Sequence, residues 1–142
     1  MREVRAYVDG GCHPNPGRGG WGVLLSCESQ GSASHEKRLS GVVPEAGTTN
    51  QRAEIYAAIR ALSALKMPCR VLLFSDSQYL IKSMLGDFSR RTNLDLWEEL
   101  DTAVAQHEIE WIWMRGHAGA RGNEIAHVLA ERAIESLLVD HG

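Results

Sequence analysis

The 142-residue chain has little cysteine, no long apolar run and no excess of positive charge. Its three cysteines, Cys12, Cys27 and Cys69, lie far apart without a C-x-x-C pair, which excludes a disulfide framework and a zinc cluster and predicts three reduced thiols. Every apolar run is far shorter than the roughly 20 residues of a membrane-spanning helix, so we expect a cytoplasmic protein. The formal net charge of −3 excludes a globally basic nucleic-acid binder, so local patches or metal ions would have to hold any polyanion.

The composition is that of an ordinary globular domain. Hydrophobic residues make up 44% of the chain and charged residues 23%, which excludes a disordered, collagen-like or coiled-coil protein. A chain of this length has room for one hydrophobic core of typical size. We therefore expect residues 1–142 to form a single domain.

Hydrophobic periodicity and turn signals predict alternating strands and helices. Residues 3–9 alternate in the manner of a half-buried strand, and Thr48 and Gln51 have the spacing of a capping box at the start of a helix. The predicted strands are residues 3–9, 21–27, 35–41, 70–74 and 109–115, and the predicted helices start near residues 48, 78, 94 and 122 and end near 65, 85, 106 and 138. This order implies an α/β fold: a mixed five-stranded sheet, with three antiparallel strands followed by parallel additions, flanked by helices on both faces.

Three acids from distant parts of the chain are expected to meet at one edge of this sheet. Asp9 ends the first strand and Asp76 ends the fourth, and parallel neighbours present their carboxyl ends side by side at the ligand-binding edge. Glu54 lies on the flank of the first helix's apolar stripe and therefore points toward the sheet. Carboxylates that crowd one cleft require a cation, and oxygen ligands suit Mg²⁺ or Mn²⁺. Taken singly, Asp76 could instead be a helix cap and Asp9 a turn residue.

The motifs around these acids resemble those of type 1 ribonuclease H over nearly the whole chain. The matching stretches are residues 7–12, 15–17, 19–22, 48–54, 75–79, 95–97, 113–119 and 122–124. The resemblance implies the ribonuclease H-like fold and endonucleolytic hydrolysis of the RNA strand of RNA–DNA hybrids, with 5′-phosphate and 3′-hydroxyl products. It also implies two divalent ions, one that activates a water and one that stabilises the leaving 3′ oxygen. Asp9 would bridge both ions, and Glu54 and Asp76 would hold the ion on the leaving-group side.

One departure from the family pattern falls at its fourth acid. Residues 123–127 read Asn-Glu-Ile-Ala-His, so His127 stands where the resemblance implies an aspartate beside the water-activating ion. Because imidazole is uncharged and softer than carboxylate, a ligating His127 predicts a relative preference for Mn²⁺ over Mg²⁺ and a loss of activity in acid, as the ring is protonated. Alternatively, His127 only relieves the repulsion among the acids. A di-iron site that used Glu124 and His127 would need a second Glu-x-x-His, which the sequence lacks.

The resemblance also assigns contacts to the substrate. Recognition of a hybrid requires contacts to 2′-hydroxyl groups across a shallow groove, which side-chain amides provide, and a pocket for phosphate. The implied contact residues are Asn15, Thr49, Asn50, Gln51 and Gln78. His117, in the glycine-rich loop 116–119, would shuttle a proton or help product release. Arg52 is either a further contact or a solvated helix residue, and the remaining histidines, His13, His35, His107 and His141, match no motif.

The chain lacks the basic, tryptophan-containing protrusion that many relatives insert after the helix that follows Asp76. The connector at residues 86–93 holds only two arginines, which predicts modest affinity for the hybrid unless Arg90, Arg91 and Lys82 compensate. The expected partner is an RNA–DNA hybrid duplex. No membrane and no obligate protein partner is expected, and the chain is expected to be a monomer.

Two alternative functions remain at this stage. One is a catalytically weakened protein that binds hybrids without cutting them, because His127 replaces an acid. The other is a different polynucleotidyl transferase of the same fold, such as an integrase or junction resolvase, which the Gly-His-Ala-Gly loop and the amide set disfavour.

Overall fold

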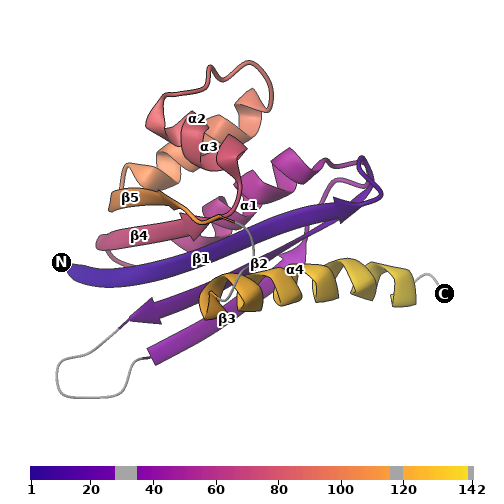
Figure 1. The fold of residues 1–142 in the computed structure, drawn as a ribbon, viewed down its shortest axis with the longest axis horizontal. Helices are drawn as coiled ribbons and strands as arrows, with labels where there is room; N and C mark the ends of the chain where they lie inside the picture. Colours follow the sequence, from indigo (N-terminus) through magenta and orange to yellow (C-terminus); the bar gives the residue numbers. More distant parts are fainter. Residues whose placement is uncertain (28–34, 116–119, 141–142) are drawn as a thin grey trace.

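The computed structural model describes residues 1–27, 35–115 and 120–140 (Figure 1). The strands are β1 (Arg2–His13), β2 (Arg18–Cys27), β3 (His35–Val42), β4 (Cys69–Ser75) and β5 (Glu108–Trp113). The helices are α1 (Asn50–Ser63), α2 (Gln78–Leu85), α3 (Leu94–Val104) and α4 (Arg121–Asp140). None of the helices in these residues is long and apolar enough to cross a membrane.

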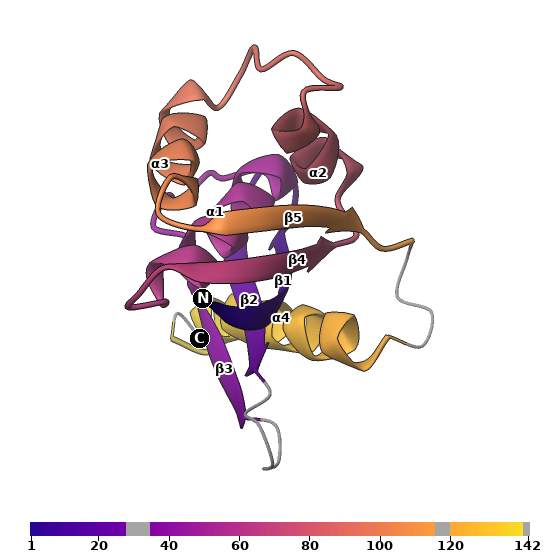
Figure 2. The same cartoon turned by 90° about the vertical axis from the view of Figure 1, so that its left-hand side faces the viewer.

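The sheet has the predicted mixed topology. Its strand order is β3-β2-β1-β4-β5. The β1–β2 and β2–β3 pairs are antiparallel, whereas the β1–β4 and β4–β5 pairs are parallel. Figure 2 shows α1, α2 and α3 on one side of the sheet and α4 on the other. The prediction of a mixed sheet with helices on both faces is confirmed.

The hydrophobic core lies between the sheet and α1. Alternate side chains of β1 and β4 are fully or almost fully buried on one face of the sheet, because a strand presents successive side chains to opposite faces. They form one buried cluster with the apolar stripe of α1. The main contributors are Val4, Ala6, Val8, Val71, Leu73, Ile55, Ala58, Ile59 and Leu62.

Two glycines allow the helices to pack directly on the backbone of the central strands. A Cβ atom at Gly10 would lie 2.2 Å from the carbonyl oxygen of Ala53 in α1, and one at Gly22 would lie 2.2 Å from that of Ala126 in α4. Any larger residue would push the helix away. Since Glu54 and His127 directly follow those two helical residues, the same close approach brings both side chains to the part of β1 that carries Asp9.

Several element boundaries differ from the predictions. The glycine-rich residues after Asp9 continue β1 to His13, because they pair with β2 as far as Arg18, so the predicted loop is a hairpin with a short turn. The predicted capping box at Thr48 is wrong. Thr49 is the N-cap of α1, with its side chain accepting a hydrogen bond from the Arg52 amide, while Thr48 is buried and its backbone bridges to Gly17. The three cysteines are free thiols, as predicted.

Candidate active site

Asp9 and Asp76 lie at the same edge of the sheet because β1 and β4 are parallel and in register. The last backbone pair of these strands is Tyr7 with Phe74, whose rings stack with centroids 4.7 Å apart. The same offset aligns Asp9 with Asp76 two residues further along. Trp113 at the end of β5 fixes the backbone there, since its indole Nε1 donates a hydrogen bond of 3.1 Å to the carbonyl oxygen of Asp76. Asp76 is not the helix cap that its isolated position allowed: Ser77 caps α2.

Glu54 joins this edge from α1. The pKa of its carboxyl is raised to about 7, mainly because burial penalises the charged form and also because Asp76 and Asp9 carry negative charge nearby. The Ser77 hydroxyl opposes the shift by donating a hydrogen bond to Oε2 of Glu54. The charges of Asp9 and Asp76 therefore act on Glu54, although the three acids are distant in sequence.

His127 contacts the same site from α4. Its Nδ1 lies 2.9 Å from Oδ2 of Asp9. The Asp9 side chain is 11% exposed, whereas that of His127 is 40% exposed, so the imidazole forms the solvent-facing side of the pair. The contact places His127 where the sequence pattern expects the fourth ligand. It is also the contact expected of a residue that only offsets negative charge.

As positioned in this structure, the described acids do not form a complete set of metal ligands. Among the residues that the structure describes, no three His, Cys, Asp or Glu side chains are grouped so that they could hold a metal ion as they stand. Asp9 is held by His127 and Glu54 by Ser77 instead. The chemistry of the donor set nevertheless fits a hard divalent cation, because it offers carboxylate oxygens at one edge and negative charges that penalise ionisation of Glu54.

Two of the predicted contact residues, Asn15 and Asn50, form one hydrogen-bonded unit. The side-chain oxygen of Asn50 accepts from the Cys12 amide at 2.9 Å, and that of Asn15 accepts from the Asn50 amide at 3.2 Å. The Cys12 thiol also donates to the Asn15 oxygen at 3.4 Å. With both oxygens occupied by the protein, the two side-chain NH₂ groups are the parts of these residues that can donate to a ligand.

The remaining predicted contact and catalytic residues differ in how they are positioned. Gln51 and Gln78 are exposed in the first turns of α1 and α2. His117 lies outside the described residues. The interpretation of Arg52 as a solvated helix residue is wrong, because its side chain is only 18% exposed and pairs with Glu45 and Asp95.

Sequence reasoning missed a second imidazole–carboxylate pair on the same seam between β1 and α4. Nε2 of His13 lies 3.0 Å from Oε1 of Glu131. Both residues follow the Asp9–His127 pair by four positions along their own elements. That shared spacing is visible in the sequence, but it became informative only once β1 was known to extend to His13. The sequence pattern gives Asn123 no role of its own, yet it is fully buried, and neither of its side-chain polar atoms is hydrogen-bonded to a residue that the structure describes.

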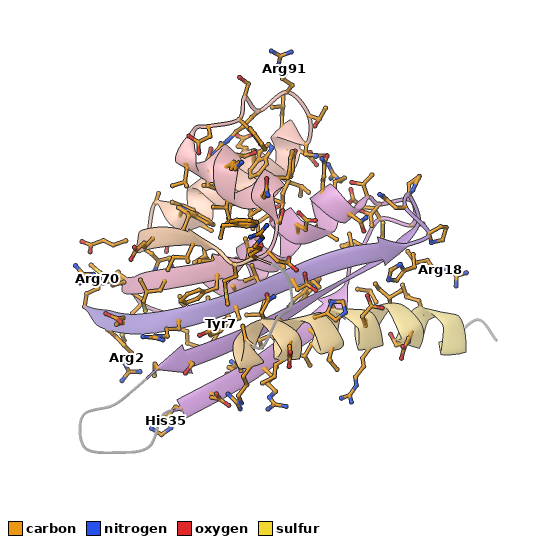
Figure 3. All side chains as sticks on the ribbon, viewed as in Figure 1. Arg2, Tyr7, Arg18, His35, Arg70 and Arg91 are labelled. Atoms are coloured by element: carbon orange, nitrogen blue, oxygen red, sulfur yellow. The ribbon has the colours of Figure 1, made fainter. Side chains whose placement is uncertain are left out.

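The connector that replaces a basic protrusion presents little free positive charge. Arg90 donates a 2.6 Å hydrogen bond to Asp101, and its guanidinium lies over the ring of Trp97. Lys82 lies over the ring of Phe88. Arg91 extends away from the molecule (Figure 3). Of the three cations expected to compensate, Arg91 is thus the one directed at solvent.

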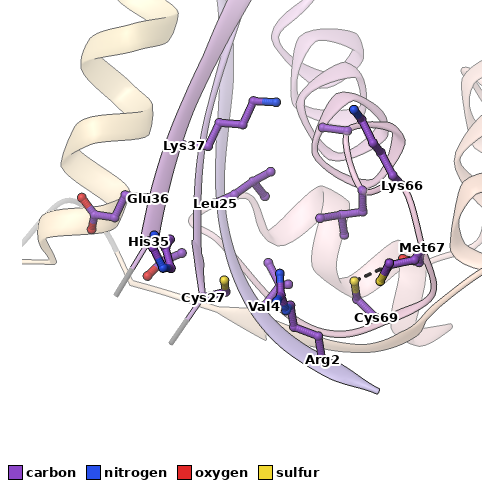
Figure 4. Close-up of a pocket in the computed structure, with 13 residues that line it drawn as sticks. Arg2, Val4, Leu25, Cys27, His35, Glu36, Lys37, Lys66, Met67 and Cys69 are labelled. Atoms are coloured by element: carbon purple, nitrogen blue, oxygen red, sulfur yellow. Dashed lines mark hydrogen bonds between the residues drawn. The ribbon is translucent and has the colours of Figure 1, made fainter. Parts of the chain in front are cut away.

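A separate pocket of about 310 Å³ lies at the opposite end of the strands (Figure 4). Its wall includes residues from the start of β1, the end of β2 and the start of β4. Arg2, Cys27, Lys66 and Cys69 are among them, and none of the candidate catalytic residues lines it. The carboxylate edge and this pocket are therefore distinct features of the molecule.

The chain resembles known proteins in both sequence and fold. The RNase H family model matches residues 1–135. The chain is 49% identical to a ribonuclease H of Nitrosococcus oceani, with 92% of this chain and 93% of that protein covered, and 46% identical to one of Cupriavidus pinatubonensis, with 96% and 99% covered. A solved structure described as LC9-RNase H1, a type 1 RNase H with the type 2 active-site motif, superposes with a TM-score of 0.81 at 31% identity, covering 96% of this chain and 74% of that one. LC11-RNase H1, solved in complex with an RNA/DNA hybrid, shares the fold with a TM-score of 0.69 at 24% identity. The chain belongs to the RNase H family.

Proposed function

We propose that this protein hydrolyses the RNA strand of RNA–DNA hybrids endonucleolytically and leaves 5′-phosphate and 3′-hydroxyl ends. The observation that carries the proposal is the meeting of Asp9, Glu54 and Asp76 at one sheet edge, where burial and like charge act on Glu54. Relatives that are 46–49% identical and named ribonuclease H support it. Its monomeric state and cytoplasmic location stay predictions.

Asp9, Glu54, Asp76 and His127 would hold the divalent ions, with Mg²⁺ or Mn²⁺ as the suitable metals and two ions as the proposed number. When bound, such ions activate a water and stabilise the leaving 3′ oxygen. Ser77 orients the Glu54 carboxylate through its hydroxyl. His127, with Nδ1 2.9 Å from Oδ2 of Asp9, would help to orient this carboxylate.

The side-chain amides supply the grip on the hybrid. The NH₂ groups of Asn15 and Asn50 can donate to 2′-hydroxyl oxygens and to base acceptors in the minor groove, because their own oxygens are already occupied. The Thr49 hydroxyl accepts from the Arg52 amide, which leaves its O–H to donate to a phosphate oxygen. Gln51 and Gln78, at the starts of α1 and α2, would add contacts. His117 would shuttle a proton or help product release.

A cleavage assay with end-labelled substrates tests the function. Wild-type protein should cut the RNA of a hybrid with Mn²⁺ or Mg²⁺, leave the DNA strand intact, and stop when EDTA is added. Asp9→Asn serves as the inactive control. Binding of hybrid without cleavage under every cation would favour the weakened binding protein instead, and cleavage of duplex DNA with the hybrid spared would favour another polynucleotidyl transferase.

The metal preference is tested in the same assay. If His127 is a ligand, the ratio of the Mn²⁺-supported rate to the Mg²⁺-supported rate should be higher in the wild type than in His127→Asp, because imidazole suits the softer ion better than carboxylate does. A ratio that His127→Asp leaves unchanged would remove His127 from the ligand set.

A further inference from the structure

Arg52 is the centre of a cluster of charged and polar side chains that we call the Arg52 cluster: Glu45, Arg52, Asn93 and Asp95. Its Nε donates to Glu45 at 2.9 Å, and its Nη2 donates to Glu45 and to Asp95, each at 2.7 Å. Its Nη1 donates to Asp95 at 3.0 Å and to the side-chain oxygen of Asn93 at 3.2 Å. All five N–H groups of the guanidinium are thereby used within the protein.

This saturation removes Arg52 from direct phosphate binding. A guanidinium has no further donor once five are engaged, and here the two carboxylates outnumber the one positive charge. The pairing with Arg52 lowers the pKa of Asp95 to about 2 and raises that of Arg52, so the pairs stay ionised at neutral pH. A phosphate that approached the cluster would meet a net negative charge.

The Arg52 cluster connects the two sides of the proposed hybrid grip. On one side, Glu45 accepts a hydrogen bond of 3.2 Å from the hydroxyl of Thr48, the residue before Thr49 and Asn50. On the other side, the side-chain nitrogen of Asn93 donates at 2.9 Å to the hydroxyl of Tyr79, the residue after Gln78. Asn93 adopts a left-handed conformation with φ of 59°, and its backbone oxygen accepts from the first turn of α3.

We propose that Arg52 is a positioning residue that holds the Thr49–Asn50 side and the Gln78 side at a fixed separation, so that both bind the same hybrid. The inference rests on the proposed function, since it concerns how that substrate is gripped. It differs from a role as a direct contact in one decisive respect. Breaking the cluster from the carboxylate side should weaken binding even though it removes a negative charge.

Asp95→Asn is therefore the sharpest variant. It keeps the size of the side chain, removes a negative charge and weakens its hydrogen bonds to Arg52. We expect KM for a hybrid to rise about tenfold while kcat changes less than about twofold, because losing a charge-assisted contact loosens the grip without touching the acids. If Arg52 contacted phosphate, the freed guanidinium would bind more tightly and KM would fall.

Arg52→Lys provides the second arm, with the charge conserved and the forked geometry lost. KM should rise here as well, and the slope of log affinity against log salt should equal that of the wild type, because no phosphate contact is removed. A slope reduced by about 0.7 to 0.9 for Arg52→Ala would mean one lost phosphate contact and would overturn the proposal.

Glu36→Gln is the matched control, since Glu36 forms a comparable pair with Arg121 at 2.5 and 2.8 Å, between β3 and α4. It should leave KM unchanged. Thermal unfolding of each variant identifies a loss of fold, which would reduce the active fraction and hence apparent kcat rather than KM. Wild-type protein that cleaves no hybrid refutes the proposed function, whereas a cleaving wild type with an unaltered KM in both Asp95→Asn and Arg52→Lys refutes this inference alone.

Discussion

The two ends of the β1–β4 pair use the same parallel register for opposite purposes. Toward the amino ends, Val4 pairs with Val71 and Ala6 with Leu73, and all four side chains are buried. Toward the carboxyl ends, the aligned residues are Asp9 and Asp76, with Glu54 beside them. Apolar burial stabilises the first end by roughly 1.5 to 3 kcal/mol for each fully buried large side chain. The second end gathers like charges, which favours a bound cation over a stable metal-free fold.

The largest expected effect is a loss of cleavage activity on substitution at the carboxyl end of the β1–β4 pair. Asp9→Asn should lower kcat on a hybrid by on the order of a thousandfold, since it removes the charge shared by the proposed ions. Its thermal midpoint should not fall, because one of the repelling charges is gone. Cleavage rates and thermal unfolding, measured on the same preparation, test both expectations. A variant that keeps wild-type activity would take Asp9 out of the reaction.

A core substitution toward the amino ends of β1 and β4 should lower stability and leave activity largely unchanged. Leu73→Ala leaves a cavity in the buried core cluster and should lower the free energy of unfolding by about 3 kcal/mol. Urea denaturation measures this loss. Activity per folded molecule should remain within about twofold of the wild type, because the acids keep their backbone positions. A large drop in kcat, with the protein still folded, would show that the two ends are coupled.

Glu54→Gln should make the metal-free protein less sensitive to pH. In the wild type, the pKa of Glu54 is about 7 in the folded state, whereas it is 4.5 in the unfolded chain. The stability that this group contributes is full below pH 4.5 and is lost as the pH rises through about 7, by about 3 kcal/mol in total. The variant should lack that decline. Urea unfolding in EDTA at pH 4.5, 6 and 8 provides the measurement, and parallel profiles would contradict the assigned shift.

The smallest expected effect concerns His127, which stands at the position of the family's fourth acid. His127→Asp should raise the ratio of Mg²⁺-supported to Mn²⁺-supported activity by severalfold, because a carboxylate adds charge and a harder donor. Initial rates on one hybrid over a range of each metal measure the ratio. His13→Asn, which changes the neighbouring pair with Glu131, provides the control and should leave the ratio as in the wild type.

Sequence reasoning performed best where the signal was local and periodic. The alternation of Val4, Ala6 and Val8 identified β1, and the parallel order of strands placed Asp9 beside Asp76. It was less successful where the conformation of one segment depends on packing against another. The residues after Asp9 look like a loop because glycine is abundant, yet they form a strand because Gly10 lies under α1 and pairs with β2.

The same limit applies to Arg52. From its place in a helix, it could be a contact or a solvated residue, and nothing in its neighbours along the chain separates these options. Its partner Glu45 lies 7 residues away, before α1. Its partner Asp95 lies 43 residues away in α3, and it comes within hydrogen-bonding distance only because α1 and α3 pack together.

By itself, the order of residues determined which elements form, which faces of them are apolar and which edge of the sheet receives the acids, since these follow from short-range sterics and from the alternation of polar and apolar groups. Tertiary structure decided how close the helices come to the sheet, and hence the Asp9–His127 contact, the shifted pKa of Glu54 and the saturation of Arg52. Burial and electrostatic interaction depend on distances between side chains that are far apart in the chain, and only packing sets those distances.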